Sequence, residues 1–199
     1  SLCIMLSIVA ALGLGSAMLD LKPRTYIFPA LVWMVFLFAA TVAIGRSFEY
    51  ELQNSAIDGI ILSGAPASAI YLSKLSANLL ILMAAQFCAV VCLSVFLNVP
   101  VLQVLGSFML LSLMVLLGYA AIATLLSAVS ARSKLRQILL PLILIPLMFP
   151  LFFAAIELSF GILSRQGLDY SSSWFSLLVA LDVVYLVLGL NLFEHTIKE

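Results

Sequence analysis

The stretch RSFEYELQNSAIDGIILSGAPASAIYLSK, residues 46–74, is the longest polar interruption in a chain that is otherwise almost entirely apolar. Offsets of three, four and seven bring Glu51, Asn54 and Asp58 onto one face of a helix. The stretch therefore predicts a short amphipathic helix in the plane of the membrane surface, followed by a Gly-Ala-Pro break that ends at Pro66. It contains five of the eighteen charged residues of the protein, namely Arg46, Glu49, Glu51, Asp58 and Lys74.

The composition of the whole chain is that of a membrane protein. Of the 199 residues, 65% are hydrophobic and only 9% are charged, and the mean hydropathy is +1.27. A soluble domain has about 25% charged residues, so lipid is the environment that fits this excess of apolar side chains. The formal net charge is zero, which leaves no electrostatic reason to expect a nucleic-acid partner.

Apolar runs of about 20 residues predict an all-α membrane protein with six spans, in one domain over residues 1–199. The run 75–131 has no charged residue over 57 positions, so it is expected to hold two spans joined by a turn at Asn98-Val-Pro100. Residues 157–173 predict a polar loop, with a short interfacial helix inside it as the alternative. The predicted spans are 1–19, 25–45, 72–97, 101–130, 137–156 and 174–193, with the amphipathic segment over 46–70 between the second and third.

Basic residues set the predicted orientation of these spans. Six basic residues fall on one side of the membrane and three on the other, which places the first group in the cytoplasm by the positive-inside rule. The chain opens with Ser1 inside an apolar run, so we expect a further N-terminal piece before it; a signal peptide over residues 1–19 is the alternative, but no basic leader supports it. The cytoplasmic group is Arg46, Lys74, Arg132, Lys134, Arg136 and Lys198, and the opposite group is Lys22, Arg24 and Arg165.

Motifs for catalysis and for metal binding are missing from the sequence. It has no Gly-Lys-Ser phosphate loop, no HExxH and no GxSxG, so we expect a subunit that catalyses no reaction itself. Cys3, Cys88 and Cys92 lie in apolar runs without a nearby His or carboxylate, which favours packing over metal binding. His195 is the one histidine; we interpret it as a solvated residue near a helix end, with haem or metal ligation as the alternative.

A few polar or helix-breaking residues inside the spans are candidates for function. Asp182 falls near the middle of the sixth span, where an ionisable group is costly and marks a functional site; a structural hydrogen bond or an interfacial position are the alternatives. Glu157, at the end of the fifth span, is expected to be an interfacial carboxylate. Pro141, Pro146 and Pro150 should bend the fifth span, either as a hinge or as irregular packing against neighbours.

Four stretches together resemble one known family. They are PALVWMVFLFA (29–39); RSFEYE from Arg46, with DGIILS from Asp58 and IYLSK ending at Lys74; RQILLPLILIPLMFP (136–150); and WFSLLVALD (174–182). In this order and over nearly the whole chain, they resemble the CcmB family, that of heme exporter protein B in cytochrome c maturation. The resemblance implies the membrane subunit of an ABC transporter.

The family resemblance also implies partners. ATP would be bound by a partner ATPase, CcmA, in a complex with CcmC and the small CcmD, and its hydrolysis would release the haem-loaded chaperone CcmE. This chain alone would bind no cofactor, although the complex handles haem, and two copies of the chain are expected. The membrane would be the bacterial inner membrane, with the mitochondrial inner membrane as the alternative. A permease that exports a lipid or drug, or a scaffold that transports nothing, are the other functions that we weigh.

By the same resemblance, the segment around 49–58 is the coupling helix that receives the ATPase. Acidic residues on one of its faces predict a basic groove on that partner. The residues assigned to ATPase coupling are Arg46, Phe48, Glu49, Glu51, Asp58, Gly59, Pro66, Tyr71 and Lys74.

Overall fold

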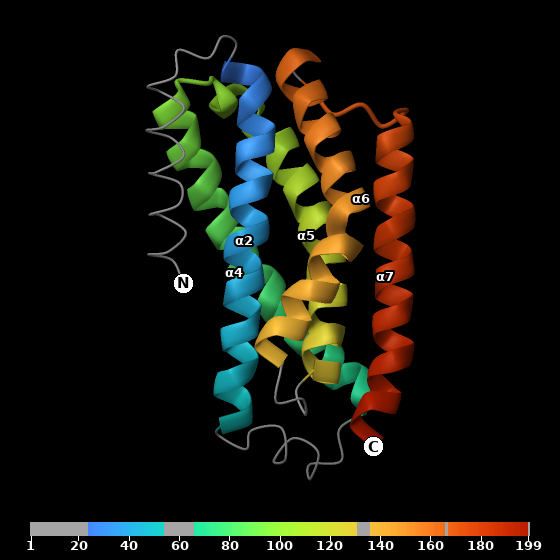
Figure 1. Cartoon of the computed structure of the whole chain (residues 1–199). Coiled ribbons are helices and arrows are strands. Elements are labelled where there is room, and N and C mark those ends of the chain that lie inside the picture. Colours follow the sequence, from blue (N-terminus) through green and yellow to red (C-terminus); the bar gives the residue numbers. More distant parts are fainter. Residues whose placement is uncertain (1–23, 54–65, 131–135, 166, 199) are drawn as a thin grey trace.

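The computed structural model describes residues 24–53, 66–130, 136–165 and 167–198, and within these ranges the chain is helical apart from short turns. Figure 1 shows the long helices side by side in one bundle. The elements are α2 (Arg24–Gln53), α4 (Ala67–Leu97), the short 3-10 helix η1 (Val101–Val104), α5 (Leu105–Ser130), α6 (Arg136–Arg165) and α7 (Ser173–Lys198).

Four of these helical segments are long and apolar enough to cross a membrane: Ala67–Leu97, Val101–Val129, Leu142–Ser164 and Ser173–Phe193. They correspond to the predicted third to sixth spans. In α2 the described apolar stretch, Ile27–Thr41, is shorter than a span, although the whole helix has 30 residues. The predicted first span, residues 1–19, lies outside the described residues.

Two helices run past the ends that the sequence predicts. Helix α2 continues through Arg46 to Gln53, so the first part of the predicted amphipathic segment belongs to the same helix as the second span. Helix α6 continues through Glu157 to Arg165, and the loop predicted over 157–173 is therefore wrong over its first half. A polar residue ends the apolar run but keeps its backbone hydrogen bonds, so it need not end the helix.

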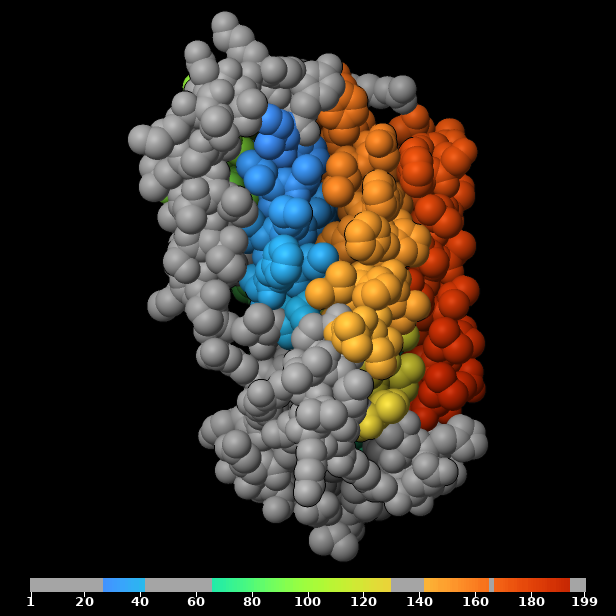
Figure 2. Space-filling model, in the orientation of Figure 1, coloured from blue at the N-terminus to red at the C-terminus, as the bar shows by residue number. Residues whose placement is uncertain are grey.

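Helix α5 is the centre of the bundle. It packs against α2, α4, α6 and α7, and it is the most buried of the candidate spans. Figure 2 shows α2 and α6 next to each other on one face of the molecule, in agreement with their direct contacts. The polypeptide thus places α5 where side chains from every other long helix can reach it.

Aromatic side chains fill the core between α2, α5 and α6. Trp33 stacks on Phe108 with ring centroids 6.3 Å apart, and Phe36 meets Tyr119 edge-on at 5.4 Å. The indole Nε1 of Trp33 donates a hydrogen bond of 2.9 Å to Ser159 Oγ. Such rings bury a large area, and the polar atom of a buried Trp needs this kind of partner. The cluster fixes α2 against α6.

The turn between α4 and α5 lies where the sequence predicts it. Asn98 has φ 52° and ends α4 in the left-handed conformation that Asn tolerates better than most residues. The backbone N–H of Val99 donates to Ser94 O at 3.1 Å, and Ser94 Oγ returns a bond to Val99 O at 2.8 Å. Pro100 then precedes η1. The tight turn makes α4 and α5 antiparallel neighbours.

Candidate functional site

Asp182 lies in the interior of α7, nine residues from Ser173, or about 14 Å along the helix axis. Its side chain is only 5% exposed. Within the candidate span Ser173–Phe193, this position lies near the middle. An ionisable group held there is a candidate functional residue on physical grounds, and its role stays a prediction.

A glycine of α5 makes room for the carboxylate of Asp182. A Cβ added at Gly118 would collide with Asp182 Oδ1 and would lie 3.4 Å from Leu151 Cδ1 of α6. In the described part of the chain, Oδ1 has no hydrogen-bond partner. A buried carboxyl oxygen without a donor is unfavourable, so this oxygen is available to accept a hydrogen bond.

Asp182 belongs to a narrow buried stripe along α7. Tyr185 Oη donates a hydrogen bond of 2.7 Å to the carbonyl oxygen of Leu147 in α6. Further along the stripe, a Cβ added at Gly189 would collide with the hydroxyl of Tyr71 in α4. Helix α7 therefore meets α4, α5 and α6 through one line of side chains. The stripe consists of Leu178, Asp182, Tyr185, Gly189 and Phe193.

Tyr71 is placed differently from the coupling surface to which the sequence assigns it. The side chain is fully buried, and its hydroxyl donates a hydrogen bond of 3.0 Å to the carbonyl oxygen of Ala121 in α5. Its ring lies 5.2 Å from that of Phe193 in α7, measured between centroids. Tyr71 is only four residues from Ala67, where α4 begins. It therefore joins the start of α4 to α5 and α7, and it cannot contact a soluble partner directly.

The other residues of the predicted coupling set are only partly described. Pro66 precedes the first turn of α4 and is exposed, and Lys74 is half-buried. Asp58 and Gly59 lie outside the described residues. Four members lie on the last third of α2, where the backbone is described but the side chains are not: Arg46, Phe48, Glu49 and Glu51.

Several buried polar contacts between helices escape sequence reasoning. Thr41 Oγ1 and Tyr119 Oη are 3.2 Å apart, and Asn78 Nδ2 donates to Thr124 Oγ1 at 3.1 Å. Gln86 is fully buried, and neither polar atom of its amide has a partner among the described residues. Amides within a long uncharged run are the signal that could have found Asn78 and Gln86, because such groups seek interhelical partners in lipid.

The prolines of α6 leave it a single continuous helix from Arg136 to Arg165. Pro146 and Pro150 are exposed, as is Glu157, about two turns beyond Pro150. For Pro141 the helix is described but the side chain is not. No interaction that the structure shows for Asp182 involves Pro146, Pro150 or Glu157; its carboxylate lies against Gly118 of α5. Whether they form a hinge stays a prediction.

The described residues contain no group of three or more His, Cys, Asp or Glu side chains that could hold a metal ion. Cys88 is an exposed free thiol and Cys92 is half-buried. The side chain of His195 lies outside the described part of the chain, although its backbone continues α7. The interior around Asp182 thus offers hydrogen-bonding groups and a carboxyl, all of them on tightly packed helices.

Comparison with known proteins assigns the chain to one group. The family model described as CcmB protein matches residues 2–198. Neither the curated proteins nor the solved structures contain a match.

Proposed function

Because the chain belongs to the CcmB family, we propose that it couples ATP hydrolysis by a partner ATPase to the release of a haem-loaded chaperone. Proteins of this family are membrane subunits of a heme exporter of the ABC type, which serves cytochrome c biogenesis. The subunit itself is of the permease type, and its helices give it a multi-pass membrane architecture.

The contact between Tyr71 and the helix core carries this proposal. An ATPase can drive a membrane subunit only if the energy of the contacts between the two proteins differs between the nucleotide states of the ATPase. The segment around 54–65 connects α2 to α4, and α4 begins one turn before Tyr71. A displacement of that segment would therefore act on the side chain of Tyr71, which is hydrogen-bonded to the carbonyl oxygen of Ala121 and packs against Gly189.

Figure 1 supports the same route, because the end of α2, the start of α4 and the end of α7 lie at one end of the bundle. A partner bound at that end could move several helices together. In our proposal CcmA docks there on the acidic face that includes Glu51 and Asp58. CcmC, CcmD and the chaperone CcmE complete the assembly, two copies of this chain are present, and the membrane is the bacterial inner membrane.

The test is ATP-dependent release of the haem-loaded chaperone from the purified complex in lipid nanodiscs. With ATP, we expect release to rise in step with phosphate production. With a non-hydrolysable analogue, release should stay at the background rate. Release that is equally fast with and without hydrolysis would support a scaffold that only holds the other subunits, and it would refute the coupling role.

A further inference from the structure

One face of α6 is exposed along the whole span, and we call it the α6 outer face. Its members are separated by four, three, four and seven residues, which places them on one side of a helix. The opposite side, with Leu144, Met148 and Leu151, is buried. Figure 2 shows that α6 reaches the molecular surface along this part of the bundle. The α6 outer face consists of Pro146, Pro150, Phe153, Glu157 and Ser164.

The backbone beneath this face lacks hydrogen-bond donors. Pro146 and Pro150 have no N–H, so the carbonyl groups of Leu142 and Pro146 lose their usual partners four residues ahead. On the side of α6 that contacts α7, Tyr185 donates to the carbonyl of Leu147, which shows how a neighbouring helix supplies a donor. A helix with unsatisfied backbone groups is tolerated in a membrane only where protein or water covers it.

Glu157 adds a charge to the same face. It lies seven residues before Ser164, the end of the span, and therefore about 10 Å inside it along the helix axis. Among the described spans the only Lys or Arg is Lys74, near the start of α4. A carboxylate on the outward side of a span is stabilised by a cationic partner.

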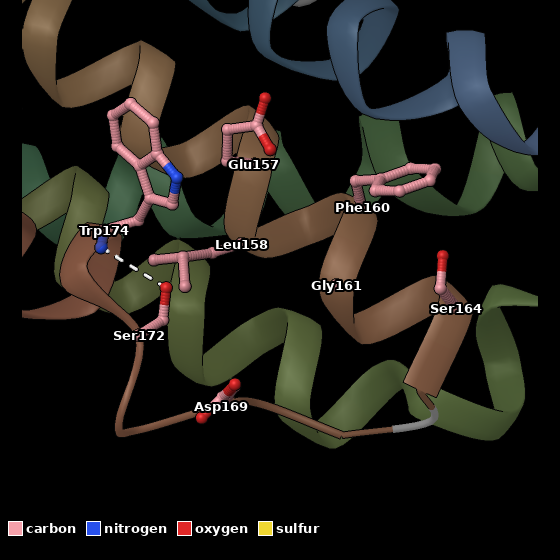
Figure 3. Close-up of a pocket in the computed structure, with 8 residues that line it drawn as sticks. All are labelled: Glu157, Leu158, Phe160, Gly161, Ser164, Asp169, Ser172 and Trp174. Atoms are coloured by element: carbon pink, nitrogen blue, oxygen red, sulfur yellow. Dashed lines mark hydrogen bonds between the residues drawn. The ribbon is translucent and has the colours of Figure 1, made fainter.

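A pocket beside Glu157 provides a place for that counter-charge. It has a volume of about 290 Å³ and lies between the last turns of α6 and the start of α7 (Figure 3). Ser172 Oγ accepts a hydrogen bond of 3.3 Å from the backbone N–H of Trp174, which fixes the loop beneath the indole. The indole of Trp174 and the carboxylate of Glu157 both line the pocket. An aromatic face next to a carboxylate is an environment that a Lys or Arg side chain prefers.

We propose that the α6 outer face binds a transmembrane helix of another polypeptide, whose Lys or Arg side chain occupies the pocket between Glu157 and Trp174. The exposed rings of Phe149 and Phe153, 5.8 Å apart, supply the apolar part of the interface. Donors on the partner helix would satisfy the carbonyls next to Pro146 and Pro150. A charge, a donor-poor backbone and a pocket on one helix face together define this partner.

The test is photo-crosslinking in membranes that contain the full complex. A photoreactive phenylalanine analogue replaces Phe153, and the matched control replaces Val184, an exposed residue of α7. We expect Phe153 to crosslink to a second polypeptide, through a peptide that lies in a transmembrane segment with a Lys or Arg. Glu157→Lys should lower this yield by more than about tenfold while the membrane level stays normal, because it puts like charges together. Glu157→Gln, which keeps the shape, should lower it less.

Three results would overturn the proposal. Crosslinks from Phe153 that return only lipid, residues 1–23 of the same chain or a second copy of this chain would show that a different occupant covers the face. Equal crosslinking to the same polypeptide from Phe153 and Val184 would show that the contact is not specific to α6. An unchanged yield in both Glu157 variants would show that the carboxylate takes no part in it.

Discussion

Replacing Gly118 by alanine tests how tightly the carboxylate of Asp182 is held against α5. The added Cβ would collide with Oδ1 and would lie 3.4 Å from Leu151, so α5 and α7 must move apart. Overpacking of this kind costs about 1–3 kcal/mol of unfolding free energy. The matched control is Gly106→Ala in α5, where the new Cβ has nothing within 4 Å and can only gain helix propensity, up to about 1 kcal/mol.

The assay is reversible unfolding in mixed micelles by titration with a denaturing detergent. We expect Gly118→Ala to be less stable than Gly106→Ala by about 1–3 kcal/mol. Asp182→Ala removes the atom that collides, so the double variant with Gly118→Ala should recover part of the loss, with a coupling energy of about 0.5–3 kcal/mol. Equal stabilities of the two glycine variants, or a coupling energy near zero, would refute the seating of Asp182 on Gly118.

Three further predictions concern the predicted site residues. Asp182→Asn should keep the membrane level of the protein and lower cytochrome c maturation. If the membrane level and maturation fall together, the residue is structural. If neither quantity changes, the buried position assigned to Asp182 is wrong. Ser55→Cys and Ser133→Cys should react with an impermeant thiol reagent from the same, cytoplasmic side, and labelling from opposite sides would contradict the topology. Glu51→Lys with Asp58→Lys should insert normally but weaken recovery of the ATPase in a pull-down, since like charges across an interface are repulsive; equal recovery would place the docking surface elsewhere.

The sequence predicts the helices better than it predicts their ends. Long uncharged runs and the Asn98–Pro100 turn identify α4 and α5 because lipid permits few other structures. The sequence predicts helix ends at Arg46 and Glu157, yet α2 and α6 continue beyond them. Both residues interrupt an apolar run, and such an interruption depends on the side chains and not on the backbone. A helix ends where its backbone bonding ends, and α2 continues even through Gly45, the helix-stop residue next to Arg46.

The partners of the buried polar groups could not be predicted from the chain. Asp182 was recognisable because a lone carboxyl in a span is rare, but nothing in the sequence pairs it with Gly118. Tyr71 lies beside the charged segment in sequence, which suggested a surface role. Its burial follows from how α4 crosses α5 and α7, and such crossings depend on the packing of whole helix faces.

The most direct measurement of the coupling role is the number of chaperone molecules released per ATP hydrolysed, in wild type and in Tyr71→Phe. The substitution keeps the ring and removes the hydrogen bond to Ala121, a bond worth about 1 kcal/mol, or roughly a fivefold change in an equilibrium. The control is Tyr170→Phe, because Tyr170 is exposed in the loop before α7. We predict that Tyr71→Phe still supports ATP hydrolysis but releases up to about fivefold fewer chaperones per ATP, whereas the control is unchanged. The same ratio in all three proteins would contradict the account.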